Sequence, residues 1–408
     1  MSYEWSLLED SAGLTDVNGF FAGSCAADIR QTQSERKDLA VVYSREKCAV
    51  AATFTTHDLP AAPIRVSQDL MNQNEDLHGF IVNSGNANAC TGEKGLQDAW
   101  DMIRCACEAC ELPASSMLVC STGRIGRALP MPHVLRGIEK AAKNAGDQAE
   151  NGKDAADAIM TSDTKRKTVS ASIRFEQGTV HMTGMAKGAG MIQPDMATML
   201  AFVTTDADLD PIVAQKALNR AVKTSFNAIT IDGDMSTNDT VILLANGTSD
   251  ITIEEENDGF TAFTEALTAL CENLAKKMVK DGERVTKCVE IFIKNAENEQ
   301  GAERVARAIG NSLLVKTSWY GNDPNWGRIL DAAGYAGAGI QENRIDLWYD
   351  DIPVLQKGIP LQEKLEDWKA IVKQSEFRIT LSLNQGDEHY RLLTTDLTQG
   401  YVEFNKSE

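Results

Sequence analysis

The sequence predicts an α/β protein made of α+β layers, in which more than one mixed β-sheet is packed with helices. The main observation is an alternation along all 408 residues. Short apolar runs of strand length alternate with longer segments whose apolar residues recur every three or four positions. Small polar turns separate the runs. The hydrophobic content of 43% is ordinary for a globular protein. The length allows roughly two to three domains.

The first part of the chain predicts a hairpin, two buried strands and two helical segments. Residues 37–56 alternate β-rich runs with polar turns, which favours a hairpin. Residues 78–92 predict a buried strand that enters a small polar loop, and a helix is expected from about 94 to 112. Residues 116–130 repeat this pattern of strand and loop. The alanine-rich segment 132–160 is predicted to be helical.

The second part of the chain continues the alternation. Asp210 and Pro211 have the residue types of a helix start, so a helix is expected from there to about residue 223. A longer helix is expected over about 259–280, and one strand directly after Thr198. The other predicted strands are 168–175, 179–186, 287–296, 377–383 and 401–405. Residues 227–247 are interpreted as a polar, acidic loop between two apolar strands.

Charge and cysteine content exclude several classes of partner. The formal net charge of −19 argues against a surface for nucleic acid or an anionic membrane, because both need clustered Lys and Arg. The N-terminal residues do not resemble a secretory signal, and no run has the length of a membrane-spanning helix. Nine cysteines without a repeating framework fit a reducing cytoplasm. Cys105, Cys107 and Cys110 lack a fourth ligand at suitable spacing, so they are interpreted as helix residues and not as a zinc site.

The segment KGAGMIQPDMATML, residues 187–200, contains the candidate nucleophile. None of the five histidines lies in a nucleophile-elbow sequence. A threonine hydroxyl needs a base, and a chain break before Thr198 would supply one as the new α-amine, whose unperturbed pKa is roughly 8. Gly188 and Gly190 permit unusual backbone conformations, and Pro194 rigidifies the approach. From residue types alone, a structural threonine at the start of a strand remains the alternative.

Six motifs, in order over nearly the whole chain, resemble the glutamate N-acetyltransferase (ornithine acetyltransferase, ArgJ) family of arginine biosynthesis. They are VNSGNANACTG, CSTGRIGRALPM, AIMTSDT, KGAGMIQPDMATML, FNAITIDGDMSTNDTVILLANG and DPNWGRIL. The resemblance implies a DmpA/ArgJ-like fold with a smaller C-terminal α/β domain from about residue 285. It also implies self-cleavage between Ala197 and Thr198. The products would be an α chain of residues 1–197 and a β chain of residues 198–408, with two of each in the assembly.

The resemblance further implies an activity on small molecules in the cytoplasm. Thr198 would take an acetyl group from N2-acetylornithine and pass it to glutamate through an acyl-enzyme, without a cofactor or a metal. Acetyl-CoA is a possible second donor that no single motif reports. Two alternatives stay open. In one, a related N-acyltransferase or amidohydrolase uses the same threonine on another substrate. In the other, the chain is a non-catalytic nucleotide-binding module, although no phosphate-binding motif supports it.

Site residues follow from the same resemblance. Thr122 and Gly123 match the family's oxyanion-hole pair, where a hydroxyl and a backbone N–H meet developing negative charge. Thr161, Lys187 and Glu283 match its substrate-binding positions. Lys187 suits a substrate carboxylate, and Glu283 suits an amine.

The C-terminal matches and two departures complete the predicted site. Asn405 matches an asparagine that closes the family's site, and Ser407 is the candidate for a hydroxyl that also contacts substrate. Arg124 stands where the family usually has an apolar residue, and Arg284 where it usually has glycine. These two cations could favour a more acidic substrate, or they could face solvent.

Overall fold

A computed structural model gives the fold and describes residues 3–9, 13–73, 76–193, 199–255 and 257–406. It confirms the predicted mixed α/β class, with helices packed on more than one sheet. The chain divides into two compact units. The first comprises Met1–Gly188, Asp195–Asn227 and Asp234–Met278, and the second comprises Ala189–Pro194, Ala228–Gly233 and Val279–Glu408.

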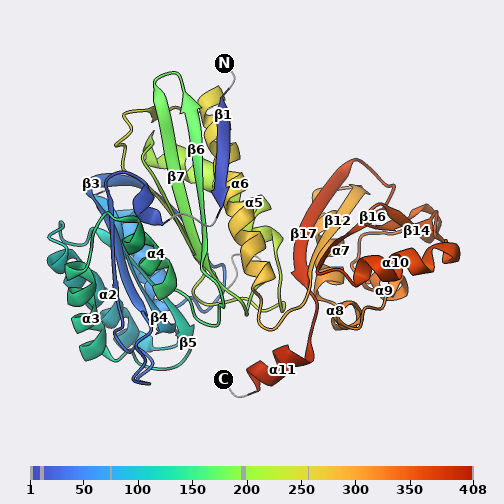
Figure 1. Ribbon diagram of the computed structural model, residues 1–408, viewed down its shortest axis with the longest axis horizontal. Helices are drawn as coiled ribbons and strands as arrows, with labels where there is room; N and C mark the ends of the chain where they lie inside the picture. The colour runs from blue at the N-terminus through green and yellow to red at the C-terminus, as the bar shows by residue number, and fades with distance from the viewer. Residues whose placement is uncertain (1–2, 10–12, 74–75, 194–198, 256, 407–408) are drawn as a thin grey trace. The chain divides into compact units, whose positions relative to one another are not determined.

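Nine strands of the described residues form the large sheet of the first unit, in the order β1-β6-β7-β8-β10-β3-β4-β5, with β2 beside β3. Figure 1 shows β1, β6 and β7 in one part of this sheet and β3, β4 and β5 in the other. Their bounds are β1 Glu4–Glu9, β2 Phe20–Cys25, β3 Leu39–Phe54, β4 Leu77–Asn86, β5 Met117–Arg124, β6 Lys167–Phe175, β7 Gly178–Lys187, β8 Leu200–Thr205 and β10 Thr240–Ala245. The neighbouring strands β8 and β10 are parallel and buried throughout. Both faces of these strands are covered, which explains their nearly continuous apolar sequences.

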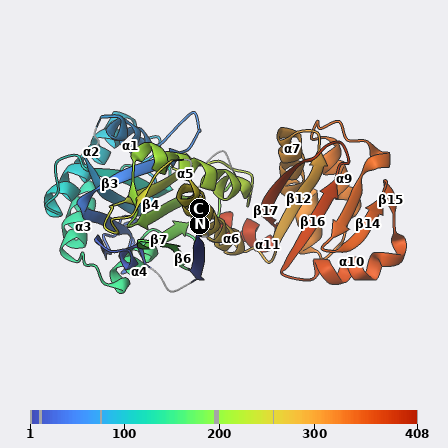
Figure 2. The same ribbon diagram turned by 90° about the horizontal axis from the view of Figure 1, so that it is seen from above.

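Helices cover both faces of this sheet (Figure 2). Helix α5 begins as predicted, because the Asp210 carboxylate accepts the N–H of Ile212 at 2.7 Å and Pro211 occupies the first turn. It packs against β3 and β10, whereas α4 packs against β2 and β3. The helix bounds are α1 Ala62–Gln73, α2 Gly92–Ala109, α3 Met131–Lys143, α4 Ala149–Ala158, α5 Pro211–Thr224 and α6 Asp258–Lys280. A separate two-stranded sheet pairs β9 Asp208–Leu209 with β11 Thr252–Ile253.

The second unit has a six-stranded sheet in the order β15-β14-β13-β16-β12-β17. Its core contains the fully buried indoles of Trp319 and Trp368. The strands are β12 Cys288–Ala296, β13 Asp346–Tyr349, β14 Ile352–Gln356, β15 Ile359–Pro360, β16 Glu376–Ser382 and β17 Glu388–Thr395. The helices are α7 Glu299–Asn311, α8 Leu313–Tyr320, α9 Trp326–Gly334, α10 Leu365–Val372 and α11 Gln399–Asn405. Across the described residues of both units, no helix has the length and apolar character needed to cross a membrane.

Four predicted elements differ from the structure. Of the two strands expected around the acidic loop of residues 227–247, the second is β10, but the first is replaced by a 3-10 helix at Phe226–Ala228 and an isolated bridge between Ile229 and Leu393.

The hairpin expected at 37–56 is the single strand β3, whose exposed residues 45–47 resemble a turn in sequence. The partner of β3 changes across these residues from β2, which pairs with β3 up to Ser44, to β10, which pairs with it from Ala49. The pairing with β4 shifts its register here and reaches Cys48. The helix expected at 132–160 is broken into α3 and α4. Gly146, between them, pairs with Ala22 of β2.

The last expected strand, at 401–405, is wrong. These residues lie in helix α11, which begins at Gln399. The side chain of Thr398 accepts the N–H of Tyr401 at 3.0 Å and so caps the helix. The alternation of apolar and polar residues over so few positions did not distinguish a strand from a short capped helix.

Candidate active site

The predicted oxyanion pair lies at the carboxyl end of β5. Thr122 is 4% exposed, and Gly123 has a φ of +134°. A Cβ atom on Gly123 would lie 2.3 Å from the carbonyl carbon of Gly85 on the neighbouring strand β4. Only glycine accommodates both the backbone angle and this close approach, so the loop conformation depends on it.

A buried lysine contacts the predicted hydroxyl. Lys187 is the last residue of β7 and is 2% exposed. Its Nζ donates to the Oγ1 of Thr122 at 3.2 Å. Because this hydroxyl accepts from a cation, its own hydrogen is left to donate to another oxygen. The fold therefore brings together two of the residues that the resemblance singles out.

Asp163 links Lys187 to the loop that contains Thr161. Its carboxylate accepts the N–H of Thr161 at 2.9 Å, the N–H of Gly188 at 2.8 Å and the Nζ of Lys167 at 2.6 Å. Burial opposes the charged form of Asp163, but the two lysines and the Gly188 N–H outweigh it and hold its pKa well below the usual value. Sequence reasoning missed this role. The only signal was an acid among the hydroxyls of residues 161–164.

The loop before β10 was also missed as a structural part of this site. Asn238 donates from Nδ2 to the carbonyl of Ala87 at 2.7 Å and to that of Ser121 at 2.9 Å. The next residue, Asp239, accepts the N–H of Met199 on its Oδ1 atom at 2.8 Å. The loop thus ties the residue before Thr122 to the first described residue after Thr198.

Asp239 is fully buried and only half hydrogen-bonded. Its Oδ2 atom has no hydrogen-bond partner among the residues that the structure describes. Burial raises the pKa of this carboxyl well above its usual value, although the Met199 N–H, the Lys187 charge and the Ser236 N–H favour ionisation.

The second unit brings Glu283 and Asn405 together. Asn405 donates from Nδ2 to Glu283 Oε2 at 2.9 Å. The Glu283 N–H donates to the Ala189 carbonyl at 2.8 Å. A Cβ atom on Gly190 would lie 2.6 Å from the Glu283 carboxyl group, so a larger residue there would displace this carboxyl group. The C-terminal helix α11 therefore holds the predicted amine-binding acid through Asn405.

A carboxylate in the same unit holds the segment that leads to the predicted cleavage point. Asp232 accepts the N–H groups of Met191 and Ile192 at 2.6 and 2.8 Å. It also accepts the hydroxyl of Tyr401, in α11, at 3.2 Å. These contacts were not expected from the sequence, which indicated only an acidic loop around residue 232.

The two unusual cations are both exposed. Arg124 ends β5, and Arg284 has its guanidinium 5.2 Å from the centre of the Phe404 ring. Arg284 has a φ of +58°, a left-handed conformation that favours the glycine expected from the family. The predicted site residues Ala197, Thr198 and Ser407 lie outside the described residues.

The clustered cysteines lie in and directly after helix α2, as predicted. Cys107 and Cys110 are buried, and burial raises the pKa of Cys110 to about 12. In the described part of the chain, no group of three or more His, Cys, Asp or Glu residues is placed to hold a metal ion.

Comparison with known proteins shows the family of this chain. The model of the ArgJ family matches residues 21–407. The arginine biosynthesis bifunctional protein ArgJ of Symbiobacterium thermophilum is 42% identical over 97% of this chain and 98% of its own. Its namesake in Thermotoga neapolitana is 42% identical over 91% and 94%. A crystal structure of ArgJ from Bacillus halodurans is 39% identical, covers 51% of this chain and 98% of its own, and has a TM-score of 0.49. From the family model and these near-full-length relatives, the chain belongs to the ArgJ family.

Proposed function

We propose that this protein is a glutamate N-acetyltransferase of arginine biosynthesis that first cleaves its own chain between Ala197 and Thr198. Membership of the ArgJ family supports the pathway. The observation that carries the proposal within the site is the buried contact between Lys187 and Thr122. It leaves a polarised hydroxyl able to stabilise an oxyanion.

Self-cleavage begins when the Oγ atom of Thr198 attacks the carbonyl carbon of Ala197. The new carbon–oxygen bond replaces the peptide carbon–nitrogen bond, and the hydroxyl proton ends on the departing amine. Water then hydrolyses the ester, which gives a carboxylate on Ala197 and a free Thr198. The new α-amine is close enough to deprotonate the hydroxyl in later turnovers.

Acetyl transfer uses the same atoms in two steps. The Thr198 hydroxyl attacks the acetyl carbonyl of N2-acetylornithine, and ornithine leaves with the proton from the α-amine. The amine of glutamate then attacks the acetyl ester and regenerates the hydroxyl. The Thr122 hydroxyl and the Gly123 N–H stabilise the oxyanion in both steps. Lys187 attracts a substrate carboxylate, Glu283 attracts an amine, and Thr161 and Asn405 complete the contacts.

Acetyl-CoA is the second donor in this proposal, because the two relatives described above are named bifunctional. The processed enzyme assembles from two α and two β chains in the cytoplasm and needs no cofactor or metal. Ser407 is kept as a substrate contact in this scheme.

Intact mass spectrometry tests the proposal in two stages. The purified protein is expected as two chains whose masses match residues 1–197 and 198–408. Incubation with N-acetylornithine should then add one acetyl group to the second chain only. Thr198→Ala is the control and should remain one unacetylated chain. Full turnover by an uncut wild-type chain would contradict the proposal.

Product analysis separates transfer from hydrolysis. With N-acetylornithine and glutamate present, acetylglutamate should form in step with ornithine. Free acetate formed at the same rate as ornithine, whether or not glutamate is present, would identify an amidohydrolase. The nucleophile would be unchanged in that case, but the acceptor would be water.

A further inference from the structure

A cavity of about 340 Å³ lies at the first turns of α1 and α2 in the first unit. These two helices pack against each other, and Figure 2 shows them side by side. The lining residues come from two short segments, 58–65 and 90–96. The volume lies within the range of small-molecule sites. None of the lining residues has a role in the acetyl transfer proposed above, so the cavity is available for another part of a substrate.

The lining combines apolar surface, a cation and a carboxylate. Leu59, which is 64% exposed, and the half-buried Leu96 give the apolar part. Arg65 is exposed and has no ion pair among the residues that the structure describes. The Asp58 carboxylate is an acceptor for an amino group. A flat ring with an amino group, linked to a phosphate, matches these features, and an adenine nucleotide has all of them.

The start of α2 adds to the attraction of Arg65 for a phosphate. Thr91 precedes this helix but makes no side-chain cap, because its hydroxyl is bonded to Asn88 instead. A Cβ atom on Gly92 would have no other atom within 4 Å, so the space beside the first turn is open. Uncapped N–H groups at a helix start favour phosphate oxygens.

A short loop connects this cavity with the oxyanion pair. The Gly126 N–H donates to the Ala89 carbonyl at 2.9 Å, and the next residue, Cys90, lines the cavity. Gly123 is three residues before Gly126, so at most about 11 Å separates them. The pantetheine arm and diphosphate of acetyl-CoA are about as long as five extended residues, on the order of 17 Å. One molecule is therefore long enough to reach from the oxyanion pair to the cavity.

This loop also carries the cation that departs from the family. Arg124 and Arg127 are both exposed. The backbone between them is fixed, since Arg124 accepts the Ala87 N–H at 3.0 Å and the Arg127 carbonyl accepts Asn86 Nδ2 at 3.2 Å. On a chain with a net charge of −19, these cations favour a donor with several phosphates locally. N-acetylornithine has a single carboxylate and gains less from them.

We propose that this cavity is the nucleotide subsite for acetyl-CoA. The adenine packs on Leu59 and Leu96, Arg65 binds a phosphate, and Arg124 attracts the phosphates beside the oxyanion pair. The inference rests on the proposed function, which takes acetyl-CoA as its second donor. It separates the two donors, because N-acetylornithine has no group that reaches the cavity. Arg124 then contributes to donor choice and does not merely face solvent.

Chemical labelling of Cys90 locates the subsite without relying on turnover. This thiol is exposed and lines the cavity. Iodoacetamide alkylates it, and peptide mass spectrometry follows the rate. The probe is desulfo-CoA, which has no thiol of its own. At ten times its Kd it should slow alkylation of Cys90 about tenfold, because only the unbound protein reacts. N-acetylornithine should give no protection.

Arg65→Ser tests the phosphate contact, and Arg174→Ser in β6 is the matched control, because both arginines are exposed. Arg65→Ser should raise the KM for acetyl-CoA about tenfold to a hundredfold, the loss expected for hydrogen bonds to a charged group. It should also abolish the protection of Cys90 and leave turnover of N-acetylornithine unchanged. Arg124→Ser should raise the KM for acetyl-CoA by a smaller factor. Arg174→Ser should match the wild type with both donors.

S-acetylpantetheine, a thioester donor without the nucleotide, gives a second comparison. Wild type and Arg65→Ser should use it equally, because the contact that distinguishes them is absent. A preference of the wild type for this donor over Arg65→Ser, as large as that for acetyl-CoA, would contradict a nucleotide subsite.

An unprotected Cys90 in the wild type would overturn the proposal, as would wild-type protection and KM in Arg65→Ser. An equal rise in KM for both donors would also overturn it, since Arg65 would then serve a common site. Melting temperatures show that each variant is folded. Failure of the proposed function is distinguishable, because it would appear as an uncut wild-type chain or as missing transfer from N-acetylornithine. Protection of Cys90 by desulfo-CoA requires neither reaction.

Discussion

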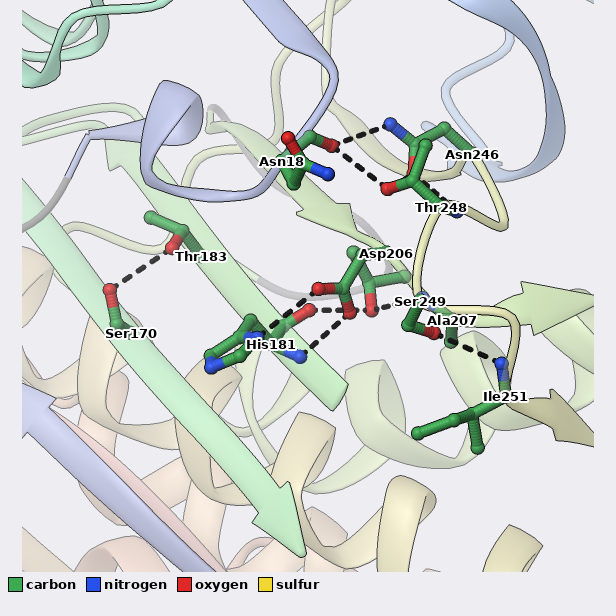
Figure 3. Close-up of polar contacts among 11 residues, drawn as sticks. Asn18, Ser170, His181, Thr183, Asp206, Ala207, Asn246, Thr248, Ser249 and Ile251 are labelled. Atoms are coloured by element: carbon green, nitrogen blue, oxygen red, sulfur yellow. Dashed lines mark hydrogen bonds and ion pairs between the residues drawn. The ribbon is translucent and has the colours of Figure 1, made fainter. Parts of the chain in front are cut away.

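The two ends of the parallel strand pair β8 and β10 have similar residue types but different hydrogen bonding. After the strands, Asp206 and Asn246 have their side-chain acceptors filled by His181 and Thr248 (Figure 3). Before the strands, Asn238 is fully engaged, but one oxygen of Asp239 lacks a partner among the described residues. A closed network stabilises a fold, whereas a buried carboxyl of raised pKa near a buried lysine is typical of a functional site.

The largest expected effect is a loss of turnover when Asn238, but not Asn246, is replaced. Asn238→Ala removes the donor to two carbonyls, including that of Ser121 beside Thr122. Turnover should fall about tenfold or more, because a buried acceptor without its donor costs on the order of 1–3 kcal/mol and the loop can shift. Steady-state kinetics with N-acetylornithine measures this loss.

Asn246→Ala is the matched control at the other end of β10. It also removes a buried donor, here to the Asn18 carbonyl at 2.8 Å. Its melting temperature should fall to a similar extent, but its turnover should stay at the wild-type level. Equal losses of turnover in the two variants would show that the two ends of β10 do not differ in their importance for catalysis.

The next effect is a gain in stability at neutral pH. In the Thr198→Ala background, which prevents cleavage, Asp239→Asn should raise the melting temperature at pH 7 by several degrees. The pKa of Asp239 is raised by burial, so above the unfolded value of about 4 the folded state binds more protons than the unfolded state. The contribution of the Asp239 carboxyl to the free energy of unfolding therefore falls as pH rises. Asparagine does not ionise, so the variant does not lose this stability.

Melting curves from pH 4 to pH 8 measure the difference between the two chains. The advantage of Asp239→Asn should shrink toward pH 4, where both states of Asp239 become protonated. A difference in melting temperature that does not depend on pH would indicate better packing in the Asn variant. It would contradict the electrostatic explanation.

The smallest effect is expected after strand β8, where both carboxylate oxygens of Asp206 have a partner. His181→Ala removes the ring nitrogen beside Asp206, but the His181 backbone N–H still binds the carboxylate. Because the imidazole is 53% exposed, the loss of stability should be at most about 1 kcal/mol. Turnover should be unchanged. A tenfold drop in kcat would show that His181 and Asp206 contribute to catalysis, which their complete hydrogen bonding does not suggest.

Sequence patterns predicted the strands and helices whose local signals agree with their final environment. The apolar runs of β8 and β10 and the Asp210 cap of α5 are examples. The failures lie where tertiary pairing decides. In β3, exposed residues 45–47 resemble a turn, but the strand continues because its second half finds β10 as a partner.

The site shows the same limit. The motifs identified Thr122 and Lys187, but only the fold shows that these residues touch, since they come from different strands. Asp163 and Asp239 were visible only as acids in polar loops. Their importance depends on burial and on the groups that contact them, and neither property can be derived from one sequence.

Amino-terminal sequencing of the acetylated enzyme tests the central claim most directly. After reaction with N-acetylornithine, the shorter fragments are sequenced and the acetyl group is located by peptide mass spectrometry. The account predicts a chain that begins Thr-Met-Leu and carries a hydroxylamine-sensitive acetyl ester on Thr198. A chain that begins elsewhere, or an acetyl group on any other residue of a fully active enzyme, would contradict it.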